Sequence, residues 1–282
     1  MTRGPLTFTS RFKNNALVII DALGDTDLQT AIHLRDEIDD ATSVSRPTYC
    51  NYFKVRSSAE LFTILDDLTD RSKAGLLPIL HIEAHGDKER GLEISTTGEM
   101  VHWDSLLPSL QAINKASRNN LGVVLAACFG LYAIKPLNIE EPCPFYFLIG
   151  PDKPVSAGDI DDMMKHFYLE LGRTNSLDKA MKKVDTQFKQ FHAEKFFYIT
   201  FSKYMKRACI GTGAQRRVEH LVTMAAEGGA ISNRASLRVI RKNARTFVRS
   251  QEHVFNRRAA LFLHGRRSVS FVELQSFVRG DS

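Results

Sequence analysis

The hydrophobic positions of the first two thirds of the chain follow two periods. Short apolar runs rich in branched residues occupy 15–23, 76–84 and 121–128. Between them, segments such as 28–41 and 57–75 carry apolar residues every three or four positions. Short apolar runs bounded by turn residues predict buried parallel strands, and the intervening periodic segments predict amphipathic helices.

Weaker strand patterns complete this part of the chain. Further strands are expected at 49–56, 144–150 and 195–201, and a small hairpin is expected over 91–103. Alternating strands and helices require right-handed crossovers and so favour a mainly parallel sheet with helices on both faces. The sequence therefore predicts an α/β fold over residues 1–204.

The pattern changes near residue 205, where strand signals stop and arginine becomes frequent. Residues 205–282 carry 15 basic and 5 acidic side chains, whereas the remaining 204 residues carry 23 basic and 27 acidic ones. Such a split predicts a second, basic and mainly helical region. We favour a helical appendage docked on the acidic body, or a surface for an activator or substrate protein, over a nucleic-acid partner, which clustered cations leave open.

Several protein classes are disfavoured by composition. No apolar run reaches the roughly 18–20 residues that span a bilayer, so no membrane partner is expected. The first fifteen residues lack the apolar core of a secretory signal. Four cysteines are scattered without a C-x-x-C pair, which favours reduced thiols and a cytoplasmic protein over a disulfide framework or a cysteine-rich zinc site.

Reactive side chains follow two of the predicted buried strands. His85-Gly86 follows one of them, and Cys128 ends the next. Because carboxyl ends of parallel strands meet at one edge of a sheet, these residues are expected to lie close together. A cysteine nucleophile needs a base such as imidazole, and the backbone N–H groups of Gly86 and Cys128 could hold an oxyanion. This predicts a Cys128/His85 dyad that requires no cofactor.

A metal site is an alternative interpretation of the same stretch. His81, Glu83 and His85 alternate along a strand and could form a two-histidine, one-carboxylate set for a metal-dependent hydrolase. A buried strand would instead point His81 and Glu83 into a helix layer, where a hydrogen-bonded pair is favoured. A second alternative is an inactive scaffold that binds protein or nucleic acid through its basic region.

The segments "ILHIEAHGD", "GLEIS" and "GVVLAACFG", in this order, resemble the caspase-like cysteine peptidases of clan CD, and most closely the bacterial CHAT-domain proteases. The caspase signature is Q-A-C-[RQG]-G with a histidine about 50 residues upstream. Here the segment reads Ala126-Ala127-Cys128-Phe129-Gly130, and His85 lies 43 residues upstream.

The resemblance covers roughly residues 15–202 and carries implications for fold and function. It implies a three-layer caspase-like fold and limited proteolysis of a protein substrate. It also implies a role in bacterial defence or programmed cell death, with activity controlled by an activating protein or by cleavage.

Departures from the caspase pattern bear on specificity. The glutamine that helps caspases bind aspartate is Ala126 here, and the loop after the first strand carries aspartates instead of arginine. An acidic pocket would favour Arg or Lys before the scissile bond, because a buried charge must be paired. Asp21 and Asp152 are the best candidates for this pocket.

Overall fold

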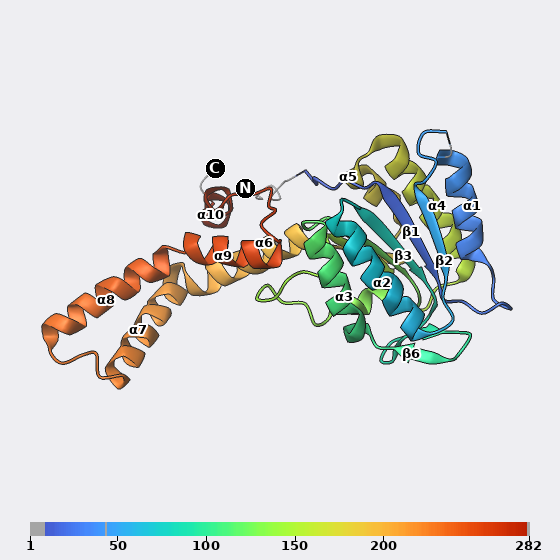
Figure 1. Cartoon of the computed structure of the whole chain (residues 1–282). Helices are drawn as coiled ribbons and strands as arrows, with labels where there is room; N and C mark the ends of the chain where they lie inside the picture. Colours follow the sequence, from blue (N-terminus) through green and yellow to red (C-terminus); the bar gives the residue numbers. More distant parts are fainter. Residues whose placement is uncertain (1–8, 43, 281–282) are drawn as a thin grey trace.

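The computed structural model describes residues 9–42 and 44–280, and a six-stranded sheet forms the centre of its α/β body (Figure 1). All neighbouring pairs are parallel except the last, which is antiparallel. In spatial order, the strands are β2 (Cys50–Lys54), β1 (Ala16–Asp21), β3 (Pro78–Glu83), β7 (Gly122–Ala126), β8 (Phe147–Pro151) and β9 (Phe188–His192). The predicted α/β architecture with a mainly parallel sheet is confirmed.

Helices cover both faces of this sheet. One pair, α2 (Ser58–Lys73) and α3 (Trp103–Ala116), packs on one face, and α1 (Thr30–Thr42) with α4 (Ala157–Thr174) packs on the other (Figure 1). Strands β1, β3, β7 and β8 are buried at every position, as near-continuous apolar runs require. The two faces of the sheet therefore form two separate hydrophobic cores.

A small antiparallel sheet lies beyond the end of β3. It contains β5 (Gly91–Ile94) and β6 (Glu99–Val101), as the predicted hairpin requires, and a third strand, β4 (His85–Asp87). His85 thus begins a new strand after the chain leaves β3. The small sheet holds the His85-Gly86 pair just outside the main sheet.

The expected strand at 195–201 is wrong, because these residues lie within α6 (Ala193–Ala208). The last strand is β9, which precedes this helix and follows the short helical segments α5 (Leu177–Ala180) and Met181–Lys183. Aromatic residues favoured a strand on propensity, but Phe197 and Phe201 are one helical turn apart and stack at 5.9 Å. Packing of these aromatic side chains in the folded chain therefore outweighs their strand propensity and stabilises a helix.

The basic region is helical, as predicted, but only part of it docks. Its helices are α7 (Gly211–Glu227), α8 (Arg234–Arg249), α9 (Glu252–Phe262) and α10 (Phe271–Arg279). Phe255, Phe262 and Phe271 of α9 and α10 belong to the core that contains α6, and α6 itself crosses the predicted boundary at 204/205.

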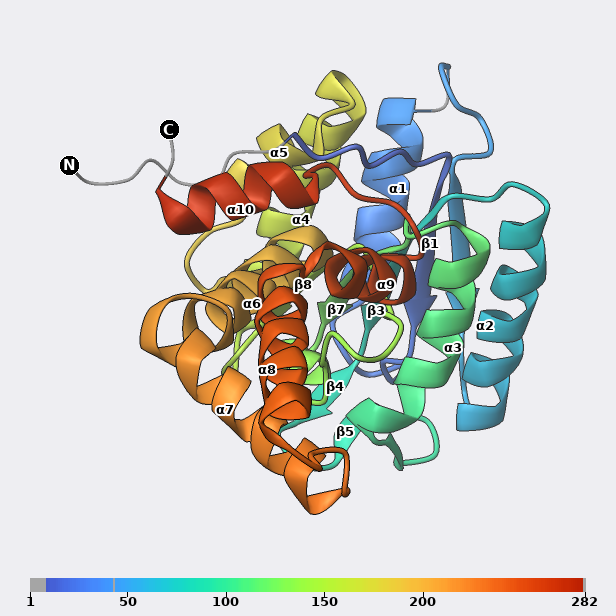
Figure 2. The ribbon, with the colours of Figure 1, turned by 90° about the vertical axis from the view of Figure 1, so that its left-hand side faces the viewer.

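Helices α7 and α8 form an antiparallel hairpin, here called the arm, that projects away from the α/β body (Figure 1; Figure 2 views it end-on). The arm has its own small core of Val218, Val222, Ala244 and Val248. The expectation of an appendage docked on the acidic body therefore holds for α9 and α10 but is wrong for the arm, which is held by its own helix–helix contact.

Acidification should destabilise the fold through His192, at the end of β9. Burial lowers the pKa of His192 to about 4, despite an opposing effect of Glu194, and burial also lowers the pKa of His264. An unfolded histidine has a pKa near 6.5, so this contribution is complete above about pH 6.5 and is lost as the pH falls towards 4. For His192 the loss is at most about 3 kcal/mol. Urea unfolding between pH 7 and pH 4 measures it, and His192→Gln should flatten the curve; an unchanged curve would contradict this.

Candidate active site

Strands β3 and β7 bring the two predicted reactive segments to one edge of the sheet. Glu83 at the end of β3 pairs in register with Ala126 at the end of β7, and the N–H of Ala84 donates to Ala126 O at 3.5 Å. His85 and Cys128 each follow two residues after this matched pair. Their proximity in space is a direct consequence of parallel register.

Cys128 lies at a corner of a tight turn. The N–H of Gly130 donates to the carbonyl of Ala127 at 2.9 Å, and Phe129 has a φ of 63°, in the left-handed region. A non-glycine residue in this region is uncommon and is enriched at functional sites. The turn leaves Cys128 half-buried, with its sulfur 3.9 Å from the carbonyl oxygen of Val155.

Gly86 packs directly on the backbone of Cys128. A Cβ atom placed on Gly86 would lie 2.0 Å from the carbonyl oxygen of Cys128 and 3.0 Å from its nitrogen. Only glycine permits this approach, because those neighbours are backbone atoms that cannot rotate away. The two predicted oxyanion donors, Gly86 and Cys128, therefore belong to backbone segments in contact.

His85 is accessible and has a carboxylate partner. Its side chain is 55% exposed, and Nε2 lies 3.2 Å from Oδ2 of Asp27, in the loop between β1 and α1. A carboxylate only accepts hydrogen bonds, so Nε2 carries the proton of this bond. In a neutral ring Nδ1 then remains as the base.

Asp27 is a site residue that the sequence interpretation placed only among the aspartates of the loop after the first strand. Its Oδ2 accepts a hydrogen bond from the N–H of Gly24 at 2.6 Å. This bond lowers the pKa of Asp27 most, burial partly opposes it, and the hydrogen bond and charge of His85 lower the pKa further. Asp27 is therefore ionised at neutral pH beside the imidazole.

The metal alternative is not supported by the geometry. His81 is fully buried, with Nδ1 3.0 Å from the hydroxyl of Tyr168 in α4, and Glu83 accepts a hydrogen bond from Thr30 in α1. His85 points instead towards Asp27. Within residues 9–42 and 44–280, no three His, Cys, Asp or Glu side chains converge as a metal site would require. His81 and Glu83 both form hydrogen bonds to side chains of the helix layer, as a buried strand predicts.

The prediction that Asp21 lines a specificity pocket is corrected by its burial. Asp21 is 0% exposed, and its carboxylate accepts hydrogen bonds from the Tyr52 hydroxyl at 2.6 Å and from Lys54 Nζ at 3.1 Å. A substrate cation would have to displace Lys54. Asp152 lies half-buried in the loop after β8 and does not line the cavity beside Cys128.

A cavity of about 270 Å³ joins these residues. His85 and Cys128 both line it, as do two carboxylates, Asp27 and Glu83. Its other lining residues are Leu23, Leu28, Thr30, Ala84, Ala126, Val155, Ala157 and Ile160. Apart from His85, the described wall of the cavity contains no basic side chain.

The side chains of Cys128 and His85 contact different partners in this structure. In the part of the chain that the structure describes, no hydrogen bond joins the two side chains: the thiol lies near Val155 O and the imidazole binds Asp27. A catalytic cysteine and its base often contact each other only loosely before substrate binds. Both side chains nevertheless line the same cavity.

Within residues 9–42 and 44–280, none of the helices combines the length and the apolar composition that a membrane span requires. Comparison of the chain with models of known protein families and with curated proteins gave no match.

Proposed function

We propose that this chain is a cysteine endopeptidase that uses Cys128 as nucleophile and His85 as base. The observation that carries the proposal is the contact of Gly86 with the Cys128 backbone, beside a cavity lined by both reactive side chains. Nucleophile, base and oxyanion donors must lie within a few ångströms of one reacting carbon, and the contact of Gly86 with Cys128 beside the shared cavity supports such an arrangement.

The mechanism follows from the protonation pattern. Nδ1 of His85 takes the thiol proton of Cys128, and the thiolate attacks the peptide carbonyl carbon. The N–H groups of Gly86 and Cys128 hold the oxyanion, and the imidazolium gives its proton to the leaving amine as the C–N bond breaks. His85 then takes a proton from water, the hydroxide attacks the thioester, and the thiol is restored.

Asp27 acts here as a positioning residue for His85. Replacing Asp27 by Asn should lower kcat about tenfold or more, because the ring loses its fixed orientation and the imidazolium loses its counter-charge. KM and the melting temperature should change little, since the amide oxygen can still accept from Gly24. Steady-state kinetics separate kcat from KM; equal losses in kcat and melting temperature would indicate a merely structural role.

The preferred substrate residue before the scissile bond is proposed to be Arg or Lys. The corrected position of Asp21 removes one support for this preference, and the carboxylates of Glu83 and Asp27 in the cavity replace it. A buried carboxylate attracts a cation much more strongly than an exposed one. Asp152, in the loop after β8, stays a second candidate although it does not line this cavity.

Fluorogenic peptides that differ only in the residue before the cleaved bond test this proposal. Peptides ending in Arg or Lys should be cleaved at least about tenfold faster than those ending in Leu or Asp. A preference for Leu or Asp would overturn the specificity and leave the dyad intact. Cleavage that chelators abolish and that survives in Cys128→Ala would overturn the dyad.

The resemblance to CHAT-domain proteases supports a protein substrate, a cytoplasmic setting and a role in defence or cell death by analogy alone.

A further inference from the structure

Helix α8 of the arm carries all its charge on one side. Its 16 residues include five arginines and one lysine, and no aspartate or glutamate. These cations, here called the α8 stripe, are Arg234, Arg238, Arg241, Lys242, Arg245 and Arg249. Their spacings of four, three, one, three and four residues follow the helical repeat, so they share one face.

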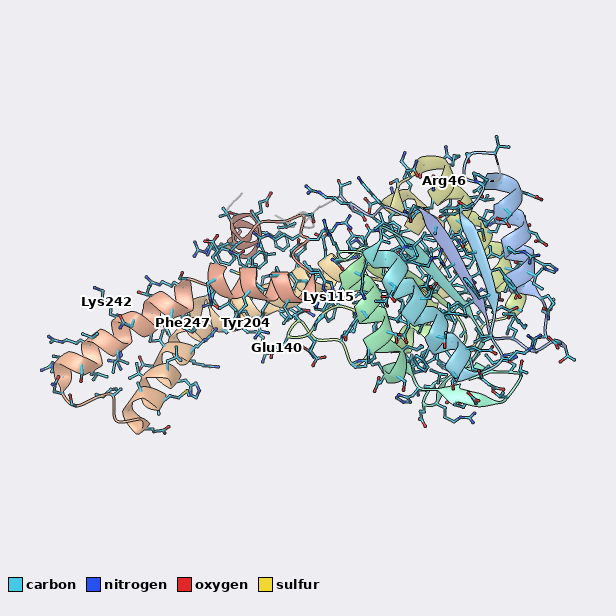
Figure 3. The ribbon with its side chains drawn as sticks, viewed as in Figure 1. Arg46, Lys115, Glu140, Tyr204, Lys242 and Phe247 are labelled. Atoms are coloured by element: carbon cyan, nitrogen blue, oxygen red, sulfur yellow. The ribbon has the colours of Figure 1, made fainter. Side chains whose placement is uncertain are left out.

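The α8 stripe is open to solvent. Five of its six cations are exposed, and only Arg241 is half-buried, with a hydrogen bond to Glu219 of α7 at 2.8 Å. Figure 3 shows Lys242 projecting from the side of the arm that faces away from α7. Like charges on adjacent turns repel one another, so a helix that keeps them together is suited to an anionic partner.

The other face of α8 is already occupied. Ala244 and Val248 are buried against Val218 and Val222 of α7. A helix that binds a lipid surface needs its apolar face to enter the acyl layer, and here that face holds the hairpin together. The exposed apolar side chains of α8, Val239 and Phe247, lie off the stripe, so the stripe itself presents charge, which favours a polyanion over a membrane.

The dimensions of the stripe match a nucleic-acid duplex. Arg234 and Arg249 are about 22 Å apart along the helix axis, at about 1.5 Å per residue. The major groove of B-DNA is about 12 Å wide and accepts a single α-helix, with phosphates along both rims. The one aromatic residue of α8, Phe247, lies outside the stripe. Binding of single strands relies on aromatic stacking, so the stripe suits a duplex.

We propose that the arm binds the phosphate backbone of duplex DNA through the α8 stripe, without reading its sequence. Guanidinium groups bind phosphate oxygens through two parallel hydrogen bonds, and five of the six stripe cations are arginines on a helix that carries no carboxylate. This activity is separate from the proposed peptidase chemistry, because the arm projects away from the α/β body that carries the cavity (Figure 1).

Fluorescence anisotropy with a labelled 20-base-pair duplex of arbitrary sequence tests the proposal. The full chain should bind with an affinity that falls steeply with salt, with a slope of log K against log salt of about −4. Replacing Arg238, Lys242 and Arg245 together by Glu should weaken binding at 100 mM salt at least about thirtyfold and make the slope shallower by about 3.

A second triple variant controls for net charge. Arg56, Lys115 and Lys182 are exposed on the α/β body, and their replacement by Glu changes the net charge by the same amount. This control should retain both affinity and salt slope, and matching melting temperatures should show that both variants fold. Equal losses in the two variants would overturn the proposal. Binding to anionic vesicles or to an acidic protein, without duplex binding, would also overturn it.

Discussion

Replacing Cys128 by alanine should lower the rate of peptide cleavage at least about 1,000-fold, because the reaction loses its nucleophile. The same change should leave the melting temperature nearly unchanged. The thiol is half-buried, and the structure gives its sulfur only a long contact of 3.9 Å with Val155 O. Loss of activity without loss of stability separates a catalytic thiol from a structural one.

Cys209→Ala is the matched control, since Cys209 is also a half-buried free thiol. It lies at the end of α6, outside the residues that line the cavity. This variant should retain full activity. If Cys128→Ala kept substantial cleavage, or if both variants lost it equally, the assignment of Cys128 as nucleophile would be wrong.

Gly86→Ala should lower activity about 100-fold or more while the nucleophile and the base are still present. The new Cβ would collide with the carbonyl oxygen of Cys128 at 2.0 Å, so β4 and the Cys128 turn must move apart. A displacement of about 1 Å at a reacting centre costs about two orders of magnitude in rate. Overpacking of this kind should also lower the free energy of unfolding by about 1–3 kcal/mol.

Gly172→Ala provides the comparison for this substitution. Gly172 lies within α4, and a Cβ atom there would meet nothing within 4 Å. Alanine should stabilise this helix by about 0.5–1 kcal/mol and leave activity unchanged. Unfolding curves and cleavage rates of the two glycine variants measure both effects. Full activity in Gly86→Ala would show that the contact with Cys128 is unimportant.

The sequence predicts most of the sheet, because buried parallel strands leave a strong local pattern. The runs at β1, β3 and β7 are apolar at nearly every position and were expected as strands. The order of β9 and α6 could not be predicted in the same way. Residues 195–201 are rich in aromatic residues, which are common in strands. They form a helix because the aromatic face of that helix packs against α9, and this contact is not visible in the local sequence.

The sequence predicts those parts of the candidate site whose position depends only on the order and direction of the strands. Parallel strands guarantee that residues after β3 and β7 emerge at one edge, which is why His85 and Cys128 line one cavity. Which side chain an individual carboxylate contacts depends on the path of its loop and on the pairing register of its strand, and the local sequence shows neither. Asp21 is buried because β1 pairs with β2 so that Lys54 lies beside it, and Asp27 reaches His85 only through its loop.

The projection of the arm from the α/β body could not be predicted from the sequence for a similar reason. Charge counting identified a basic region, and helical spacing places its cations on one face of α8. Neither observation says whether a helix docks on the body or projects from it. That choice depends on α7 and α8 forming a core of their own, which is a long-range contact.

Mapping a covalent adduct shows directly whether Cys128 is the reactive thiol of this chain. A peptide acyloxymethyl ketone ending in Arg is incubated with the full chain at pH 7, and the modified residue is identified by peptide mass spectrometry. Burial raises the pKa of Cys50 and of Cys143 to about 12 and also raises the pKa of Cys209, so these three thiols should stay protonated and unreactive. We expect one adduct per chain, on Cys128, that is lost in His85→Ala. Absence of any adduct, or labelling of Cys50 or Cys209 as fast as Cys128, would contradict it.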